Sequence, residues 1–389
     1  MSVLAPPRRL DLTLLLPVVA LAALGLVMIY SSSSVLAAER FHSETFFLQR
    51  QAVRMLIGLA LMLVLSRVDY HVYQRLAPWL LVAAVILLGV VLALGRGVRG
   101  ANRWIQFASL TVQPVELARS ACVIYLAKLL DRKGERIASF GSGVLPALSV
   151  LGILAALILC QPNLGSTMAL LATGLVMLHL AGARFRHLAA LAAVAAVVAV
   201  VMILTNDYMQ ARVTGWLGHM GGVQADGQGK GWQLRQSLLA LGSGGLFGAG
   251  PGRGMQKFYF LPDPHTDFIF AVIGEELGLL GATAVLIAYL LFFLRGLKVA
   301  GRAPDRFGFL LAAGLTVNLI VYVGLNVAVV TGLIPTTGLP LPFLSYGGSA
   351  LIVNLGVVGV LLNIASQMET GIRTNPVAGG HARRRHGGR

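Results

Sequence analysis

Three carboxylates in the stretch "LPDPHTDFIFAVIGEELG", residues 261–278, are the first candidates for chemistry. Asp267 directly precedes an apolar run, and Glu275 and Glu276 lie inside that run. A carboxylate at the edge of hydrocarbon can act as a general base, because partial desolvation raises its affinity for a proton. An aspartate just before a helix can equally cap the first free backbone amides. Glu276 would lie on the face opposite Asp267, where it could serve packing between helices.

A second polar group lies in "TVQPVELARS". Gln113, Glu116 and Arg119 recur every three residues and would therefore line one face of a helix. Polar side chains in a membrane span are costly unless they face a partner or a cavity. Glu116 and Arg119 would either pair with each other or form the wall of a polar cavity that opens to the outside. Just upstream, "RGANRWIQF" places Arg103 beside Trp104, whose ring suits the membrane interface.

The elements that must position these residues are membrane-spanning helices. The chain is 57% hydrophobic and only 12% charged, and its apolar runs match the roughly 20 residues that a helix needs to cross a bilayer. Such runs are expected to be helical, because a helix satisfies its own backbone hydrogen bonds. We predict an all-α polytopic domain over residues 1–370 and a basic tail over 371–389. Its ten spans lie near 11–32, 51–67, 74–95, 111–130, 141–160, 163–182, 186–205, 267–295, 307–332 and 348–368.

The distribution of basic residues predicts the orientation. Of the 31 Lys and Arg residues, the larger part falls on one side of the predicted spans, and by the positive-inside rule that side is cytoplasmic. Both termini are then cytoplasmic, and a long segment at 206–266 is outside. The net charge of +16 reflects this bias and the tail, and we expect no nucleic-acid binding, since no basic soluble domain is present. Cys122 and Cys160 form no pattern typical of disulfides or metal sites.

The outer segment is rich in glycine. It includes "GSGGLFGAGPGRG" at 242–254, where backbone amides could approach a phosphate, although tight turns alone are the simpler explanation of the glycines. Before it, "WQLRQSLLALG" spaces Leu234, Leu238 and Leu241 at helical intervals. This spacing predicts a short amphipathic helix that lies at the membrane interface.

Several segments together resemble the SEDS family, whose members include FtsW, RodA and SpoVE. They are "DLTLLLPVVALAALGLVMIYSSS", "GANRWIQFASLTVQPVELAR", "QPNLGSTM", the long stretch from "RQSLLALGSGG" to "GEELG", and "GLIPTTGLPLPFLSYGGSALIVNL". Their order covers nearly the whole chain. The early "DLTLL", the "SSS" and the "GEELG" are closer to FtsW than to RodA.

The resemblance implies a bacterial inner-membrane enzyme that polymerises lipid II, the undecaprenyl-pyrophosphate-linked disaccharide pentapeptide, on the outer face of the membrane. Its implied catalytic residue is Asp267. The implied substrate-binding residues, with those that the sequence places nearby, are Arg103, Trp104, Gln113, Glu116, Arg119, Arg212, Lys257 and His265. The resemblance also implies a cognate class B penicillin-binding protein and other division or elongation proteins as partners. No cofactor is required by the sequence, although a divalent cation, Mg²⁺ or Mn²⁺, could accompany the pyrophosphate.

Two positions depart from the family pattern. Relatives often carry aspartate in the "QPDLG" turn, where this chain has Asn163, so hydrogen bonding survives there without the charge. FtsW-type relatives often carry a glutamate eight residues before the catalytic aspartate, where this chain has Tyr259. An acidic helper or metal ligand is absent from that position, unless Asp263 replaces it.

Two other functions fit the same pattern of spans. A lipid II flippase would use the same bundle and cavity without a base. A non-enzymatic scaffold of a division or elongation complex would need neither Asp267 nor Arg212.

The predicted orientation can be tested by labelling single cysteines from outside intact cells. A cysteine at Gly227 should react and one at Gly380 should not, because residues 206–266 are expected outside and the tail inside. The reverse pattern would overturn the orientation and any chemistry at the outer face.

Overall fold

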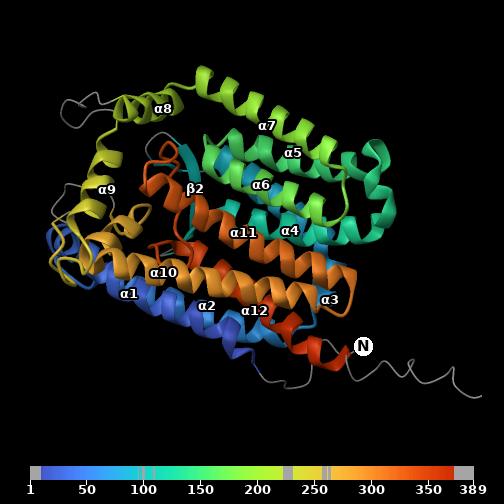
Figure 1. Cartoon of the computed structure of the whole chain (residues 1–389), viewed down its shortest axis with the longest axis horizontal. Helices are drawn as coiled ribbons and strands as arrows, with labels where there is room; N and C mark the ends of the chain where they lie inside the picture. Colours follow the sequence, from blue (N-terminus) through green and yellow to red (C-terminus); the bar gives the residue numbers. More distant parts are fainter. Residues whose placement is uncertain are drawn as a thin grey trace, which may run out of the picture.

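The computed structural model describes residues 10–94, 96–98, 101–107, 110–221, 231–255, 261 and 264–371. Its long helices run side by side in one bundle, with the short helices α8 (Asp207–Met220) and α9 (Trp232–Ser243) at the end opposite the beginning of α1 (Leu12–Phe41) (Figure 1). Ten helices correspond to the ten predicted spans: α1 (Leu12–Phe41), α2 (Phe46–Arg67), α3 (Tyr70–Leu94), α4 (Pro114–Lys133), α5 (Leu145–Leu159), α6 (Leu164–Leu180), α7 (Phe185–Thr205), α10 (Ile269–Gly301), α11 (Arg306–Val330) and α12 (Gly348–Gly371).

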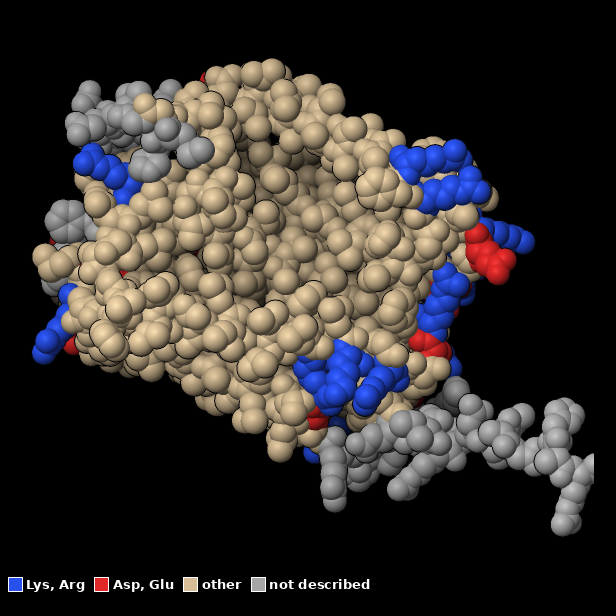
Figure 2. Space-filling view, viewed as in Figure 1, with Lys and Arg blue, Asp and Glu red and all other residues tan. Residues whose placement is uncertain are grey.

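The prediction of a helical membrane protein is confirmed. In the described chain, eight helices are long and apolar enough to cross a membrane, and α6 is a shorter apolar helix. Helix α4 is more polar, and it lies inside the bundle with most of its side chains buried. On the face drawn in Figure 2, Lys and Arg gather toward the ends of the bundle and leave a broad uncharged zone between them.

The connections between the long helices contain further secondary structure. Two short helices, α8 (Asp207–Met220) and α9 (Trp232–Ser243), lie in the long segment between α7 and α10. The predicted amphipathic helix is therefore present as α9, and it packs on α10 and α11, with Leu234 buried and the Ser237 hydroxyl donating to the Val330 carbonyl at 2.8 Å. Its position at a membrane interface stays a prediction.

A small antiparallel sheet precedes α4. Its strands are β1 (Arg96–Val98), β2 (Ala101–Phe107) and β3 (Leu110–Val112), in the order β1-β2-β3. The predicted fourth span began at residue 111, but residues 111 and 112 belong to β3, and the helix begins at Pro114. Proline at the first helical position fits this boundary, because it needs no amide hydrogen bond there.

Helix α10 is interrupted in its first third. Gly278 has φ +68° and ψ −168°, which breaks the helical hydrogen-bond ladder at that point. The glycine-rich segment 242–254 repairs the break, because the amides of Leu279 and Leu280 donate to the carbonyls of Gly245 and Leu246, at 2.9 and 3.2 Å. In return, the amides of Ala249 and Gly250 donate to the carbonyls of Glu275 and Glu276.

The two glutamates inside the span hold the same segment through their side chains. The Met255 amide donates to Glu275 Oε1 at 2.6 Å, and the Gly252 amide donates to Glu276 Oε2 at 3.0 Å. Ser31 of α1 also donates to Glu276, at 2.6 and 2.7 Å to its two oxygens. These amides are occupied by the protein's own groups, so the phosphate-cradle interpretation of the glycine run is wrong for this part of the segment. Glu276 links helices, as its position opposite Asp267 suggested.

The close approach of the glycine segment to α10 predicts a sharp effect of one methyl group. Gly248 has φ +80°, and a Cβ there would lie 2.2 Å from the Glu276 carbonyl oxygen. We expect Gly248→Ala to lower the free energy of unfolding by about 2–4 kcal/mol through strain and overlap. Gly242→Ala is the control, because a Cβ at Gly242 would meet no atom within 4 Å. Thermal melting in detergent measures both, and equal melting temperatures would contradict the proposed fit.

Candidate functional site

Asp267 lies in a turn over residues 264–268, immediately before α10. The residue at the N-cap position of α10 is Phe268, whose side chain makes no capping hydrogen bond. Asp267 therefore lies one residue before the position that the capping interpretation required. Asp267 is half-buried and lies close to Arg212 of α8.

The backbone of this turn is held by polar groups from α11 and from the segment that precedes α12. Asn326 Nδ2 donates to the Asp267 carbonyl at 2.8 Å, and the Ser345 hydroxyl donates to the Thr266 carbonyl at 2.6 Å. The Tyr346 amide donates to the His265 carbonyl at 2.8 Å. Three successive carbonyls are thus fixed by three donors, which sets the position of the Asp267 side chain.

Arg212 reaches the same place from α8. Gly338 stands between the two charged groups: the position of a Cβ on Gly338 would lie 3.3 Å from Asp267 Oδ2 and 3.8 Å from Arg212 Nη1. Arg212 Nη1 also donates to the Thr336 carbonyl at 2.8 Å. Gly338 has φ +75°, a backbone conformation that favours glycine. The structure therefore brings together the implied catalytic carboxylate and one of the implied substrate-binding cations.

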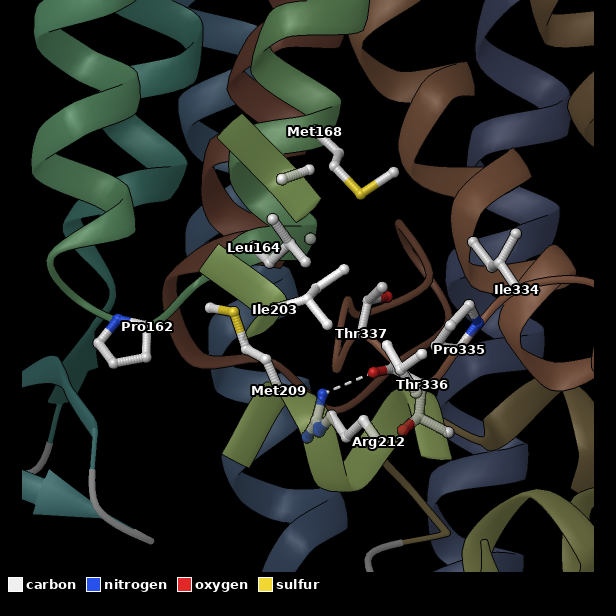
Figure 3. Close-up of a pocket in the computed structure, with 13 residues that line it drawn as sticks. Pro162, Leu164, Met168, Ile203, Met209, Arg212, Ile334, Pro335, Thr336 and Thr337 are labelled. Atoms are coloured by element: carbon white, nitrogen blue, oxygen red, sulfur yellow. Dashed lines mark hydrogen bonds between the residues drawn. The ribbon is translucent and has the colours of Figure 1, made fainter. Parts of the chain in front are cut away.

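An apolar cavity of about 190 Å³ adjoins Arg212. Figure 3 shows it between α6, α7 and α8 and the segment 334–337, with Arg212 at its edge and the hydrogen bond to Thr336 drawn. The labelled apolar side chains that line it include Met168, Ile203, Met209 and Ile334. The cavity thus combines a hydrocarbon-like interior with one cation at its rim.

Arg103 and Trp104 lie on β2, and both are half-buried. Arg103 Nε donates to the Gln161 carbonyl at 3.0 Å, and its Nη2 donates to the Pro162 carbonyl. Pro162 also lines the cavity that Arg212 borders. In the same turn, Asn163 Oδ1 accepts from the Ser166 amide at 3.3 Å and caps α6, so the hydrogen bonding expected of this uncharged residue is present.

Glu116 and Arg119 form a buried ion pair on α4. Arg119 Nη2 lies 2.6 Å from Glu116 Oε2, and each residue is only 1% exposed. Arg119 also donates to Asn354 Oδ1 on α12, and its guanidinium lies 4.0 Å from the centre of the Tyr322 ring on α11. These contacts favour the interpretation in which the pair holds helices together over the one in which it forms an open cavity wall.

The remaining predicted residues are distributed around this end of the bundle. Gln113 is the N-cap residue of α4, and its backbone amide donates to the Ser349 hydroxyl at 2.8 Å. The buried His265 ring contacts the rings of Phe47 and Tyr346, with centroids 4.7 and 5.5 Å away. Lys257 lies outside the described residues.

The sequence analysis missed three residues that the site uses. Asn326 and Gly338 hold and separate the charged groups, and Arg54 of α2 is buried beside Tyr346, 4.8 Å from the centre of its ring. The signal for Arg54 was available, because a charge inside a predicted span is itself an indication of function. Asn326 and Gly338 carried no comparable signal.

The fold and the site define a polytopic helical membrane protein with a polar centre at one end. The chain belongs to the FtsW/RodA/SpoVE family, whose sequence model, described as a cell cycle protein, matches residues 12–370. A relative from Geobacter metallireducens, named as a probable peptidoglycan glycosyltransferase FtsW, is 41% identical over 93% of this chain and 96% of its own length. Stage V sporulation protein E of Bacillus subtilis is 40% identical over 91% of this chain and 96% of its own length.

Solved structures share the fold. A chain of a structure described as "Structural coordination of polymerization and crosslinking by a peptidoglycan synthase complex" has a TM-score of 0.76 and 30% identity, over 92% of this chain and 98% of its own. The rod shape determining protein RodA of Thermus thermophilus has a TM-score of 0.67 and 30% identity, over 92% of this chain and 97% of its own. The identity to a relative named FtsW, 41%, is higher than the 30% identity to RodA, which agrees with the expectation that this chain is closer to FtsW. The chain is an integral membrane protein.

The buried ion pair on α4 predicts a coupling between its two partners. Arg119→Met should lower the free energy of unfolding by about 3–5 kcal/mol, because the Glu116 carboxylate would stay buried without its partner. The double variant with Glu116→Gln should lose less than the single variant by at least about 1 kcal/mol. Melting of the single and double variants in detergent measures this coupling. Strictly additive losses would contradict a structural pair.

Proposed function

We propose that this protein is a lipid II polymerase, a peptidoglycan glycosyltransferase that joins undecaprenyl-pyrophosphate-linked disaccharides into glycan strands. The observation that carries the proposal is the approach of the Asp267 carboxylate and the Arg212 guanidinium to one point beside Gly338, next to an apolar cavity. The names of the relatives, probable peptidoglycan glycosyltransferases among them, support the same reaction class.

The reaction requires a base and a cation close together. The acceptor's 4-hydroxyl attacks the anomeric carbon of the donor, its proton passes to the Asp267 carboxylate, and the new C–O bond forms with inversion. The bond from the anomeric carbon to the pyrophosphate oxygen breaks, and the pyrophosphate leaves with the electron pair. Arg212 stabilises the negative charge that builds on the leaving group, an effect that is strong in a site shielded from water.

The cavity supports the lipid part of the proposal. Its apolar lining suits part of a polyprenyl chain, while Arg212 at the rim suits the pyrophosphate to which that chain is attached. Arg103 holds the turn at Pro162, and His265 lies two residues before the proposed base, so both act near the substrate. Lys257 keeps its proposed binding role on the basis of the family resemblance.

A divalent cation, Mg²⁺ or Mn²⁺, would accompany the pyrophosphate in this proposal. Within the described chain, no group of three or more His, Cys, Asp or Glu side chains is arranged to hold a metal ion. Mg²⁺ or Mn²⁺ would therefore have to be bound largely by pyrophosphate and water oxygens, as Mg²⁺ commonly is in phosphate sites.

The site faces the outside in this proposal, and both termini are cytoplasmic, as the basic residues predict. The similarity to a chain of a peptidoglycan synthase complex supports a cognate class B penicillin-binding protein as the partner, with its single span packed on this bundle. Lipid II itself and other division or elongation proteins complete the proposed set of partners.

One experiment separates this proposal from a flippase and from a scaffold. The purified protein receives labelled lipid II on the outer leaflet of vesicles, with and without the transpeptidase. Glycan polymer supports the transferase, and exchange of the label between leaflets without polymer supports the flippase. If neither polymer nor exchange is observed, the result supports the scaffold.

Asp267→Asn tests the base directly. Asparagine cannot take the proton of the acceptor hydroxyl, so the polymerisation rate should fall by a factor of about 100 to 10,000. Membrane abundance and melting temperature should stay close to those of the parent protein, because the Asp267 carbonyl keeps its hydrogen bond from Asn326. Asp207→Asn, on the first turn of α8, is the matched control and should polymerise normally. Polymerisation by Asp267→Asn within a few fold of the parent would remove Asp267 from the catalytic role.

A further inference from the structure

Arg54 is a buried cation that pairs with no carboxylate among the residues that the structure describes. It lies in α2, eight residues after Phe46 and so about 12 Å along the helix. The residue is 5% exposed, and its Nη1 has no hydrogen-bond partner within the described ranges. In the described chain its one charge-related contact is the face of the Tyr346 ring, 4.8 Å from the guanidinium carbon. A guanidinium in an apolar bundle without an anion is costly, and a ring face compensates only part of that cost.

The surroundings of Arg54 increase this cost. Its guanidinium carbon lies 3.8 Å from the position of a Cβ on Gly348, the first residue of α12. The N-terminus of a helix presents free amides and the positive end of the helix dipole. A cation and a helix N-terminus therefore meet in one buried place, where each disfavours the other unless an anion lies between them.

The neighbouring polar groups do not supply that anion: the polar atom nearest to the Cβ position of Gly348 is the carbonyl oxygen of Thr111, which carries no net charge. Gln51 Nε2 donates to the Ser345 carbonyl at 3.3 Å, and the Ser349 hydroxyl accepts from the Gln113 amide. The carboxylate of Glu116, close to Gln113 in sequence, is already paired with Arg119. Arg54 and the first amides of α12, which we call the α12 anion pocket, are thus arranged for an anionic group that comes from outside the chain.

The α12 anion pocket is connected to the proposed site through Tyr346, and its cation comes from a different helix than Arg212. The Tyr346 ring lies under Arg54 and also contacts the His265 ring, two residues before Asp267. Arg212 approaches Asp267 from α8 beside Gly338, whereas Arg54 lies on α2 and its guanidinium stacks on the Tyr346 ring. The two cations therefore lie at different places, Arg212 beside Asp267 and Arg54 beside Tyr346.

We propose that the α12 anion pocket binds the pyrophosphate that the acceptor lipid keeps during transfer. The inference rests on the proposed function, in which both substrates carry a lipid pyrophosphate. The donor's pyrophosphate leaves from the reacting carbon, so its cation must stand beside the base, as Arg212 does. The acceptor's pyrophosphate is separated from its reacting hydroxyl by the length of a disaccharide, so its cation must stand away from the base.

Binding of undecaprenyl pyrophosphate to the full-length protein in lipid nanodiscs tests the pocket. The parent protein should bind two molecules, and Arg54→Gln should bind one, with the affinity of the lost site lowered at least about tenfold. Arg50→Gln is the matched control and should still bind two, because Arg50 lies one turn earlier on α2, is exposed, and stacks on the Phe46 ring at 4.2 Å. Two molecules on Arg54→Gln, or fewer than two on the parent protein, would overturn the proposal.

Two competitors identify what the pocket recognises. Undecaprenol should not displace the probe from the site that depends on Arg54, and equal competition by undecaprenol would overturn recognition of the anion. Inorganic pyrophosphate should compete more weakly than the lipid form. Equal affinity for both would assign the pocket to a free anion and would overturn its role with the acceptor.

Kinetics separate the acceptor from the donor. With lipid II whose 4-hydroxyl is blocked as donor, Arg54→Gln should raise the KM for unblocked acceptor lipid II about tenfold and leave the KM for the donor within about twofold. A change in the donor KM alone would overturn the assignment. If the parent protein makes no polymer, the proposed function fails, while the binding stoichiometry still decides whether the pocket exists.

Stability distinguishes binding from a structural role. Without added lipid, Arg54→Gln should melt at the temperature of the parent protein or above it, because an uncompensated buried charge has been removed. Arg54→Lys keeps the charge and should keep part of the binding. Failure of both variants to fold, or a clear loss of melting temperature in both, would show a structural arginine and contradict the proposal.

Discussion

The amide of Asn326 is the contact on which the proposed site depends. Its Nδ2 lies on α11 and donates to the carbonyls of Asp267 and Leu339, at 2.8 and 2.7 Å. Water is scarce within a membrane bundle, so backbone that leaves the helical conformation must find partners inside the protein. One buried side chain thereby joins the turn that carries Asp267 to the segment that carries Gly338 and approaches Arg212. The positions of base and cation follow from that shared support.

Hydropathy was sufficient to predict where helices lie, since eight of them are recognisable by length and apolar composition alone. It did not predict α8 or the strands that precede α4. Helix α8, which carries Arg212, is a 14-residue helix with mixed composition, and the strands near Arg103 pair with one another over only a few residues. The family resemblance supplied Arg212 and Asp267 as candidates, but their approach beside Gly338 depends on tertiary contacts between segments more than 50 residues apart in sequence.

Charged residues inside the spans have three different roles in this bundle, and their partners distinguish them. Glu116 and Arg119 neutralise each other, and Asn354 completes their hydrogen bonding. Glu275 and Glu276 accept hydrogen bonds from backbone amides and so hold the glycine-rich segment against the interrupted helix α10. Arg54 has neither kind of partner within the described chain. A sequence can indicate that all these residues are costly to bury, but only the structure indicates which of them is compensated by the protein itself.

The uncompensated charge of Arg54 makes the proposed site different on its donor and acceptor sides. A transferase that joins two similar lipid-linked substrates must distinguish the one that loses its pyrophosphate from the one that keeps it. A cation beside the base lowers the barrier as charge develops on the leaving group, whereas the same cation on the other pyrophosphate would only strengthen binding and would not raise the rate at saturation. Arg212 meets the first requirement through its proximity to Asp267. Arg54, on another helix and behind another ring, meets the second, so donor and acceptor are told apart by position and not by chemistry.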